Sequence, residues 1–119
     1  MLWLLVWLLV WLLGMTVLQA GAADEPTQLQ LPSKLQHVSF TGGDGSSCEK
    51  AVVIQNAANN FEGVAAEKAW ISWKYPKAKL KSQGLSGIGN KTFDRLEIET
   101  AQGASKTICF DITDFFGQW

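Results

Sequence analysis

The chain has 119 residues, of which 47% are hydrophobic, and its 10 basic and 11 acidic side chains give a net charge of −1. This balance excludes a strongly basic nucleic-acid-binding protein, because such a protein needs a cationic surface. Two cysteines and one histidine are too few for a four-ligand Cys/His zinc site within one chain. The length corresponds to one small domain, and no motif indicates a metal or a cofactor.

Residues 1–22 contain 18 hydrophobic residues and no charged side chain. A helix of this composition is apolar on every side, and the 97 residues that follow cannot enclose it. The segment ends in Ala20-Gly21-Ala22, a small-x-small pattern that signal peptidases recognise. We therefore predict a signal peptide over residues 1–22. The alternative is an uncleaved anchor that contacts the membrane through residues 1–20, because about 20 apolar residues span a bilayer.

Both alternatives place the remaining chain outside the cytoplasm, secreted or periplasmic. Cys48 and Cys109 are the only cysteines, so a single pairing is available in an oxidising compartment. Closing a loop of about 60 residues would stabilise the fold by roughly 4 kcal/mol. A redox-active pair is disfavoured, because the sequence contains no C-x-x-C motif. We predict a structural disulfide between Cys48 and Cys109, with two free thiols as the alternative.

Residues 23–36 are polar and contain two prolines, which indicates a flexible arm. Residues 37–41 alternate between apolar and polar side chains, as strands do. After a glycine-rich break at 42–47, the β-branched run within residues 50–55 predicts a buried strand.

The one helix that the sequence predicts runs from Asn60 to about Tyr75. Asn59 or Asn60 is a suitable N-cap, and Pro76 ends the helix. The apolar positions do not form one clean stripe, so we expect either Trp70 or Trp73 to be partly exposed. Three alanines and the two tryptophans would lie on the sheet side: Ala65, Ala66, Ala69, Trp70 and Trp73.

Three strands are predicted in the last third, over residues 79–86, 91–100 and 105–112, where side chains alternate with a period of two. In the last of them Cys109 points away from the apolar face of Ile108, so the disulfide should lie opposite the helix or at a sheet edge. The expected fold is α+β, with one helix packed on a four- or five-stranded antiparallel sheet in β-β-α-β-β-β order, over a single domain at 37–119.

Three segments, FTGGDGSSCEKAVVI (40–54), EGVAAEKAW (62–70) and FDITDFFGQW (110–119), resemble small secreted bacterial proteins of uncharacterised function. The resemblance spans most of the chain after the leader. It implies export, and it implies no activity and no catalytic residues.

The one local cluster of basic and aromatic residues spans the end of the predicted helix and the following strand. Such a cluster could contact an acidic partner or an envelope polymer. The alternative is a solvated helix end, where cations are favoured in any case. The candidate partner-binding residues are Trp70, Trp73, Lys74, Tyr75, Lys77, Lys79 and Lys81.

A second candidate is the glycine-rich loop, in which successive backbone N–H groups could form an anion-binding nest. It lacks the P-loop motif and the spacing of a calcium loop. A plain turn between two strands would need no ligand, because glycine supplies positive φ and aspartate bonds its own backbone. The loop residues are Gly42, Gly43, Asp44, Gly45 and Ser46.

Paired carboxylates for hydrolysis could come from Asp111, Asp114 and Glu97, with Glu99 beside them. The simpler interpretation is a charge-balanced, solvated sheet face. His37 lies one strand length away from Ser46, so a nucleophile–histidine pair is disfavoured.

The sequence therefore predicts an exported, non-catalytic binding or interaction protein that contacts another protein or an envelope polymer. One concrete form is an inhibitor of an extracytoplasmic hydrolase. The rival class is a small extracytoplasmic hydrolase that uses paired carboxylates.

Overall fold

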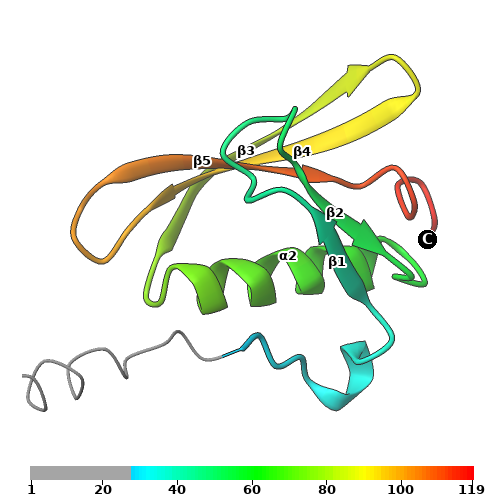
Figure 1. The fold of residues 1–119 in the computed structure, drawn as a ribbon, viewed down its shortest axis with the longest axis horizontal. Coiled ribbons are helices and arrows are strands. Elements are labelled where there is room, and N and C mark those ends of the chain that lie inside the picture. The colour runs from blue at the N-terminus through cyan, green and yellow to red at the C-terminus, as the bar shows by residue number, and fades with distance from the viewer. Residues whose placement is uncertain (1–27) are drawn as a thin grey trace, which may run out of the picture.

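A computed structural model describes residues 28–119, so the predicted leader and residues 23–27 of the predicted arm lie outside the described residues. The elements in chain order are η1 (Ser33–Leu35), β1 (Ser39–Gly42), β2 (Val52–Gln55), α2 (Asn60–Lys74), β3 (Lys79–Ile88), β4 (Lys91–Glu99) and β5 (Ser105–Asp111). The five strands form one sheet in the order β1-β2-β5-β4-β3, and α2 packs on one face of it (Figure 1). The predicted α+β class and the β-β-α-β-β-β order are confirmed.

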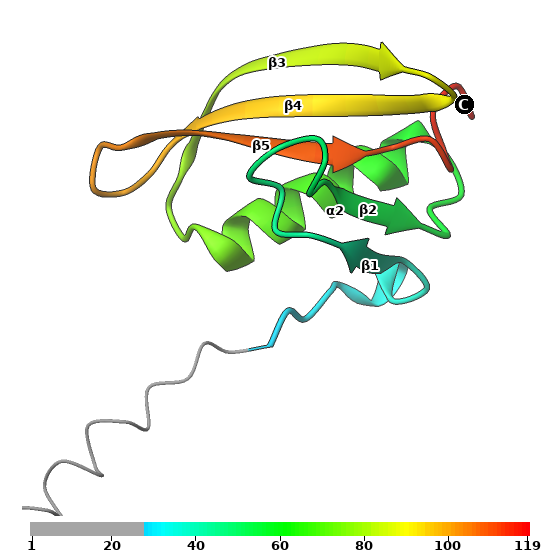
Figure 2. The same ribbon diagram turned by 45° about the horizontal axis from the view of Figure 1, so that its top comes forward.

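The sheet is mixed, which corrects the expected purely antiparallel arrangement. β2 pairs with β5 in parallel, with Val52 opposite Phe110, whereas the other three strand pairs are antiparallel. After β2 the chain crosses the sheet through α2 and the β3–β4 hairpin, and β5 then returns beside β2 in the same direction (Figure 2). A crossover through a helix is the connection that parallel strands require.

Local hydrogen bonds explain where α2 begins and ends. The Asn59 side chain accepts a hydrogen bond from the backbone N–H of Glu62 at 3.0 Å. The Glu62 carboxylate in turn accepts the backbone N–H of Ala58 at 2.8 Å, so two N–H groups at the helix start are satisfied. The helix ends at Lys74, two residues before Pro76, as the restriction on the residue before proline requires.

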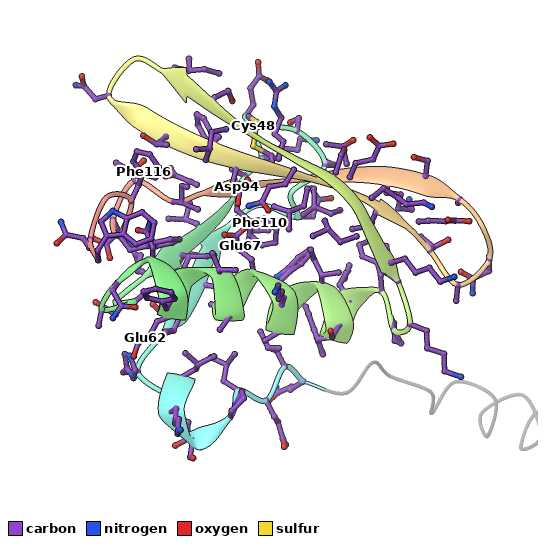
Figure 3. All side chains as sticks on the ribbon, turned by 180° about the vertical axis from the view of Figure 1, so that it is seen from behind. Cys48, Glu62, Glu67, Asp94, Phe110 and Phe116 are labelled. Atoms are coloured by element: carbon purple, nitrogen blue, oxygen red, sulfur yellow. A yellow bond between two sulfur atoms is a disulfide. The ribbon has the colours of Figure 1, made fainter. Side chains whose placement is uncertain are left out.

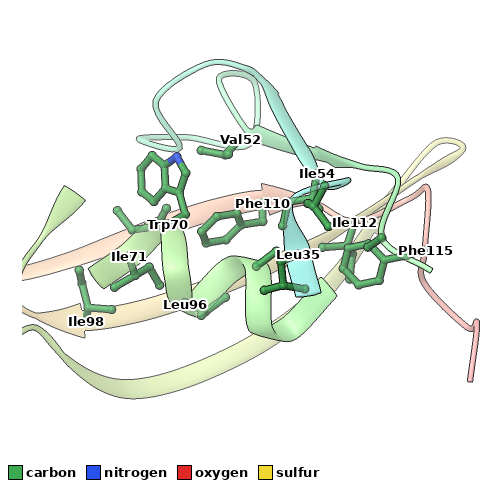
Figure 4. Close-up of a cluster of buried hydrophobic side chains, with 14 residues drawn as sticks. Leu35, Val52, Ile54, Trp70, Ile71, Leu96, Ile98, Phe110, Ile112 and Phe115 are labelled. Atoms are coloured by element: carbon green, nitrogen blue, oxygen red, sulfur yellow. The ribbon is translucent and has the colours of Figure 1, made fainter. Parts of the chain in front are cut away.

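The main core lies between α2 and the sheet (Figure 4). Leu96 and Ile98 of β4 face the helix and are buried, as the two-residue period predicts. Trp70 is buried among them, whereas Trp73 is partly exposed, which confirms that one of the two tryptophans is partly exposed. Phe110 packs edge-on against Trp70, with their ring centres 5.5 Å apart.

Cys48 and Cys109 form a disulfide, as predicted, across 61 residues of sequence. Cys109 packs with Ala51 and Phe93 in a second, smaller cluster that is separate from the helix-side core. The disulfide therefore lies on the sheet face opposite α2, and it ties the loop before β2 to β5.

Residues 28–36 pack on the domain, in contrast to the flexible arm expected from their polar composition. Leu35 is buried in the main core, and Leu29 and Leu31 are partly buried against it, which removes apolar surface from water. The chain end is also docked, since Phe115 is buried and the backbone N–H of Asn60 donates to the Gln118 carbonyl at 2.7 Å. Within residues 28–119 no helix has the length and apolar character needed to cross a membrane.

Candidate functional site

The structure divides the predicted basic and aromatic cluster between the core and the surface. Trp70 belongs to the core, so it does not contribute to a partner-binding surface. The Lys74 ammonium lies 5.8 Å from the Trp73 ring centre, and Lys106 lies 5.7 Å from the Tyr75 ring centre. The two rings of this cluster that remain at the surface, Trp73 and Tyr75, therefore each have a lysine ammonium beside them.

The lysines of this cluster separate in the same way. Lys81 forms an ion pair with Glu99 at 3.0 Å, and this pair lowers the pKa of Glu99. Lys77 and Lys79 are exposed. Lys74, Tyr75 and Lys77 do share one shallow hollow of about 380 Å³ with the β4–β5 turn. The structure thus brings three of the seven predicted residues together at a solvated helix end.

The glycine-rich loop uses its own backbone donors. The N–H of Gly43 donates to Ala51, and the N–H of Gly45 donates to Lys50. The Asp44 carboxylate accepts the backbone N–H of Ser46 at 3.0 Å, and hydrogen bonding from Ser46 lowers the pKa of Asp44. Gly42 and Gly45 have φ angles of 84° and 78°, which only glycine adopts readily. These contacts are those of a closed turn, because they leave few N–H groups for an anion.

The carboxylates considered for hydrolysis do not meet in one place. Asp111 accepts hydrogen bonds from the backbone N–H and the hydroxyl of Thr113, at 3.0 and 2.6 Å. Asp114 accepts the backbone N–H of Asn56, and Glu97 accepts the hydroxyls of two serines on neighbouring strands. Each carboxylate is thus already occupied in its own turn or strand pair.

His37 also lies apart from the serines of the glycine-rich loop. Its Nε2 atom is 2.7 Å from the Glu62 carboxylate at the start of α2. The Ala58 backbone N–H and then His37 lower the pKa of Glu62. His37 therefore joins the segment before β1 to the helix and is not part of a nucleophile–base pair.

A different pair of carboxyl groups, which the sequence interpretation missed, lies between the helix and the sheet. Glu67 faces the sheet from the middle of α2, and Asp94 faces the helix from β4 (Figure 3). Their exposed fractions are 1% and 2%, which is exceptional for acidic side chains. Among the described residues outside the pair, no donor group hydrogen-bonds to either carboxyl oxygen of Glu67 or to Oδ1 of Asp94.

The surroundings of Glu67 favour its protonated form. Burial, followed by the neighbouring Asp94 carboxylate, which accepts a hydrogen bond from protonated Glu67, raises the pKa of Glu67 to about 10. Two carboxylates in one dry site cannot both be ionised at low cost, so one of them retains its proton at neutral pH. The Gln83 side chain of β3 donates to Oδ2 of Asp94 at 2.6 Å, which fixes the orientation of that group.

The pair lies at the floor of a cleft of about 450 Å³ between α2, the β3–β4 hairpin and the chain end. Leu85 lies directly opposite Asp94 in the β3–β4 register, and it is 58% exposed. The other walls are mostly apolar. The lining residues are Asn60, Val64, Glu67, Gln83, Gly84, Leu85, Asp94, Ile112, Phe115 and Phe116.

Apolar surface continues beyond the cleft along α2. Phe61 and Trp119 are 72% and 84% exposed, and their rings meet edge-on with centres 6.0 Å apart. With Val64 they line a second hollow of about 490 Å³, which shares Val64 and Asn60 with the cleft. Exposed apolar patches of this kind mark interaction sites in soluble domains.

One signal in the sequence could have identified the buried pair. Asp94 has the same parity in its strand as Leu96 and Ile98, so a strand that buries these two residues also places Asp94 under the helix. Glu67 follows Gly63 by four residues and precedes Ile71 by four, which places it on the buried side of α2.

No group of three or more histidine, cysteine or acidic side chains is placed to hold a metal ion within residues 28–119. No known protein family, curated protein or solved structure matches the chain. The site's own geometry is therefore the basis for the function proposed below.

Proposed function

We propose that this protein is an exported, non-catalytic binding domain that holds a protein partner in the cleft between α2 and the β3–β4 hairpin. The observation that carries the proposal is the combination of exposed apolar walls with two buried carboxyl groups beneath them. Leu85, Val64 and Phe116 are all more than a third exposed at this cleft. Binding sites typically combine mostly apolar walls with a few convergent polar groups.

Export is the part of the proposal that the leader and the disulfide support. The apolar, charge-free segment at 1–22 has the composition of a signal peptide. The Cys48–Cys109 disulfide fits an oxidising compartment outside the cytoplasm. We therefore propose an envelope or secreted protein as the partner. An extracytoplasmic hydrolase that is inhibited on binding is one such partner.

The cleft is a better candidate surface than the basic and aromatic cluster. In that cluster Lys74 and Lys81 are paired within the domain, and Trp70 is in the core. At the cleft, by contrast, burying Leu85 and Phe116 against a partner would remove apolar surface from water, which is the main driving force for association.

A matched pair of substitutions on β3 tests this surface. Leu80 and Leu85 are both exposed and lie on the same strand, but only Leu85 lines the cleft. With a photo-crosslinking amino acid at position 85 in the natively exported chain, we expect a discrete cross-linked partner, and none from position 80. Leu85→Glu should abolish capture of that partner, and Leu80→Glu should retain it. Capture that is equal in both variants would refute the proposed surface.

A second candidate function is a small hydrolase, and the observation that favours it is the Glu67–Asp94 pair itself. Two neighbouring carboxyl groups in an apolar site, one of them with a raised pKa, form an arrangement that acid–base hydrolysis uses. The pair replaces Asp111, Asp114 and Glu97, which the structure keeps apart. Hydrolysis of a panel of chromogenic glycosides and peptides, lost in both Glu67→Gln and Asp94→Asn, would support this function. Turnover that survives both substitutions would count against it.

A further inference from the structure

We propose that the cleft receives the ammonium group of a lysine side chain from the partner, and that Glu67 and Asp94 bind it. This inference rests on the proposed function and adds the chemistry of the contact. It assigns the buried pair a role in recognition, in addition to its place in the core.

The unsatisfied acceptors are the first argument. Both oxygens of Glu67 and Oδ1 of Asp94 are buried and receive no hydrogen bond from another described residue. A buried acceptor without a donor costs free energy, so such atoms are rare in folded proteins. An ammonium group carries three N–H donors and no acceptor, so it could donate to the oxygens of the pair that the hydrogen bond between Glu67 and Asp94 leaves unsatisfied.

Charge is the second argument. Two acidic side chains meet at this site, and their oxygens carry negative charge or partial negative charge that favours a cation. No basic side chain lines the cleft, and the nearest cation that acts on Glu67 is Lys68, which follows it on α2 and is exposed. A buried negative charge without a cation attracts one from a partner, because opposite charges interact more strongly away from water.

The shape of the walls is the third argument. Val64, Ile112 and Phe115 surround the approach to the pair with apolar atoms. A lysine side chain has a four-carbon apolar stem below its charged end, so it would place methylene groups against these walls and the ammonium on the floor. A carboxylate or a phosphate would meet the pair with the same sign of charge.

Gln83 is the group that such an ammonium would displace or join. Its side-chain amide donates to Asp94, at 2.6 Å from Oδ2. Gln83 lies on the outermost strand of the sheet and is exposed, so its side chain can move aside without disturbing the core. The carboxyl oxygens are covered in the structure, and movement of this amide is the simplest way to reach them.

The test uses three probes with the intact mature protein, followed by NMR of its backbone amides. The probes are acetyl-Leu-Lys-Leu-amide, the same peptide with norleucine in place of lysine, and butylammonium chloride. We expect the lysine peptide to shift the amides around Gln83 and Leu85 and to bind at least about tenfold more tightly than the norleucine peptide. Equal affinities, or no binding of the lysine peptide at millimolar concentration, would overturn the inference.

Substitutions at Glu67 and Asp94 test whether these residues account for the preference for the lysine peptide. Glu67→Gln combined with Asp94→Asn should reduce the affinity for the lysine peptide to that of the norleucine peptide, whereas Glu49→Gln, an exposed change of the same charge, should leave it unchanged. Because the peptide comparison is made on the wild-type chain, the inference remains testable if the double variant does not fold. Butylammonium binding as tightly as the lysine peptide would overturn the assignment to a partner side chain.

The proposed function and the proposed lysine contact can be refuted independently of each other. If lysine and norleucine peptides bind the cleft equally, the cation inference is wrong and the apolar binding cleft stands. The proposed function is wrong if cross-linking at position 85 captures no partner, or if Leu85→Glu still captures it. This holds whatever the peptides do.

Discussion

Gly63 of α2 and the ring of Phe115 are packed so closely that a methyl group on Gly63 would overlap the ring. Both residues are buried, and the contact holds the chain end against the start of the helix. Glycine in a helix interior is normally unfavourable, by about 1 kcal/mol relative to alanine. The close approach of Phe115 is the physical reason for it here.

Gly63→Ala is therefore expected to destabilise the protein although it improves helix propensity. Overlap with the Phe115 ring should outweigh the propensity gain and lower the free energy of unfolding by about 1–2 kcal/mol. Urea unfolding followed by circular dichroism measures this. Gly84→Ala is the control, because no atom lies within 4 Å of a Cβ at that position. A Gly63→Ala protein as stable as wild type would contradict the packing described.

The raised pKa of Glu67 predicts a stability that falls with rising pH. Its pKa is about 10 in the folded protein against an ordinary 4.5, so the folded state holds a proton that the unfolded state releases between these values. The stabilisation is complete below pH 4.5 and decreases up to about pH 10, and by pH 7 about 3 kcal/mol of it is lost. Glu67→Gln, which resembles the protonated acid, should remove this slope and be more stable than wild type at pH 8.

Urea unfolding from pH 5 to pH 9 checks this expectation as the difference between wild type and Glu67→Gln. Glu49→Gln provides the control, since it makes the same substitution at an exposed position. Parallel pH profiles for wild type and Glu67→Gln would show that Glu67 is ionised in the folded protein.

The disulfide is expected to contribute a large part of the stability of so small a domain. Cys48→Ala together with Cys109→Ala should lower the free energy of unfolding by about 4 kcal/mol, because the unfolded chain regains the freedom of a 61-residue loop. Calorimetry with and without reductant provides the measurement. Reductant should lower the melting temperature of wild type and leave the double variant unchanged. A loss below 1 kcal/mol would indicate that the unfolded chain stays compact without the cross-link.

Two tryptophans should behave in opposite ways on truncation. Trp70 is buried against Phe110, so Trp70→Ala is expected to cost about 3–5 kcal/mol and to leave little folded protein. Trp119 is 84% exposed, so Trp119→Ala should change stability by less than about 0.5 kcal/mol. Thermal unfolding of both variants tests the pair. A strongly destabilised Trp119→Ala protein would show that the Phe61 contact supports the fold.

The sequence predicted those parts of the fold that depend on local patterns. The alternation of Leu96 and Ile98 with charged residues gave the buried face of β4, and Asn59 and Pro76 gave the ends of α2 within one residue. The parallel pairing of β2 with β5 could not be predicted in this way, because alternation is the same in parallel and antiparallel strands. Strand direction depends on where the crossover passes, which is a property of the whole chain.

The site was harder to predict than the fold for a related reason. A single glutamate or aspartate in a sequence indicates solvated surface, so the sequence did not distinguish Glu67 and Asp94. The candidates for hydrolysis were therefore sought among the acidic residues near the chain end. What makes the pair unusual is that Glu67 of the helix and Asp94 of the strand meet in space although they are 27 residues apart in sequence. Trp70 shows the reverse case, since it lies in the sequence between Lys68 and Lys74, whereas in space it packs in the apolar core.

The parallel β2–β5 pair also influences the order in which the chain folds. Helix α2 and the β3–β4–β5 meander are contiguous in sequence, so they require only short loops to form, whereas Val52 must find Phe110 across most of the domain. The disulfide holds the segments next to these residues together, so we expect the oxidised chain to refold faster than the reduced one. Until β2 pairs with β5, one side of β5 is open to strands of other chains, and the cross-link should shorten that exposure by holding Val52 near Phe110.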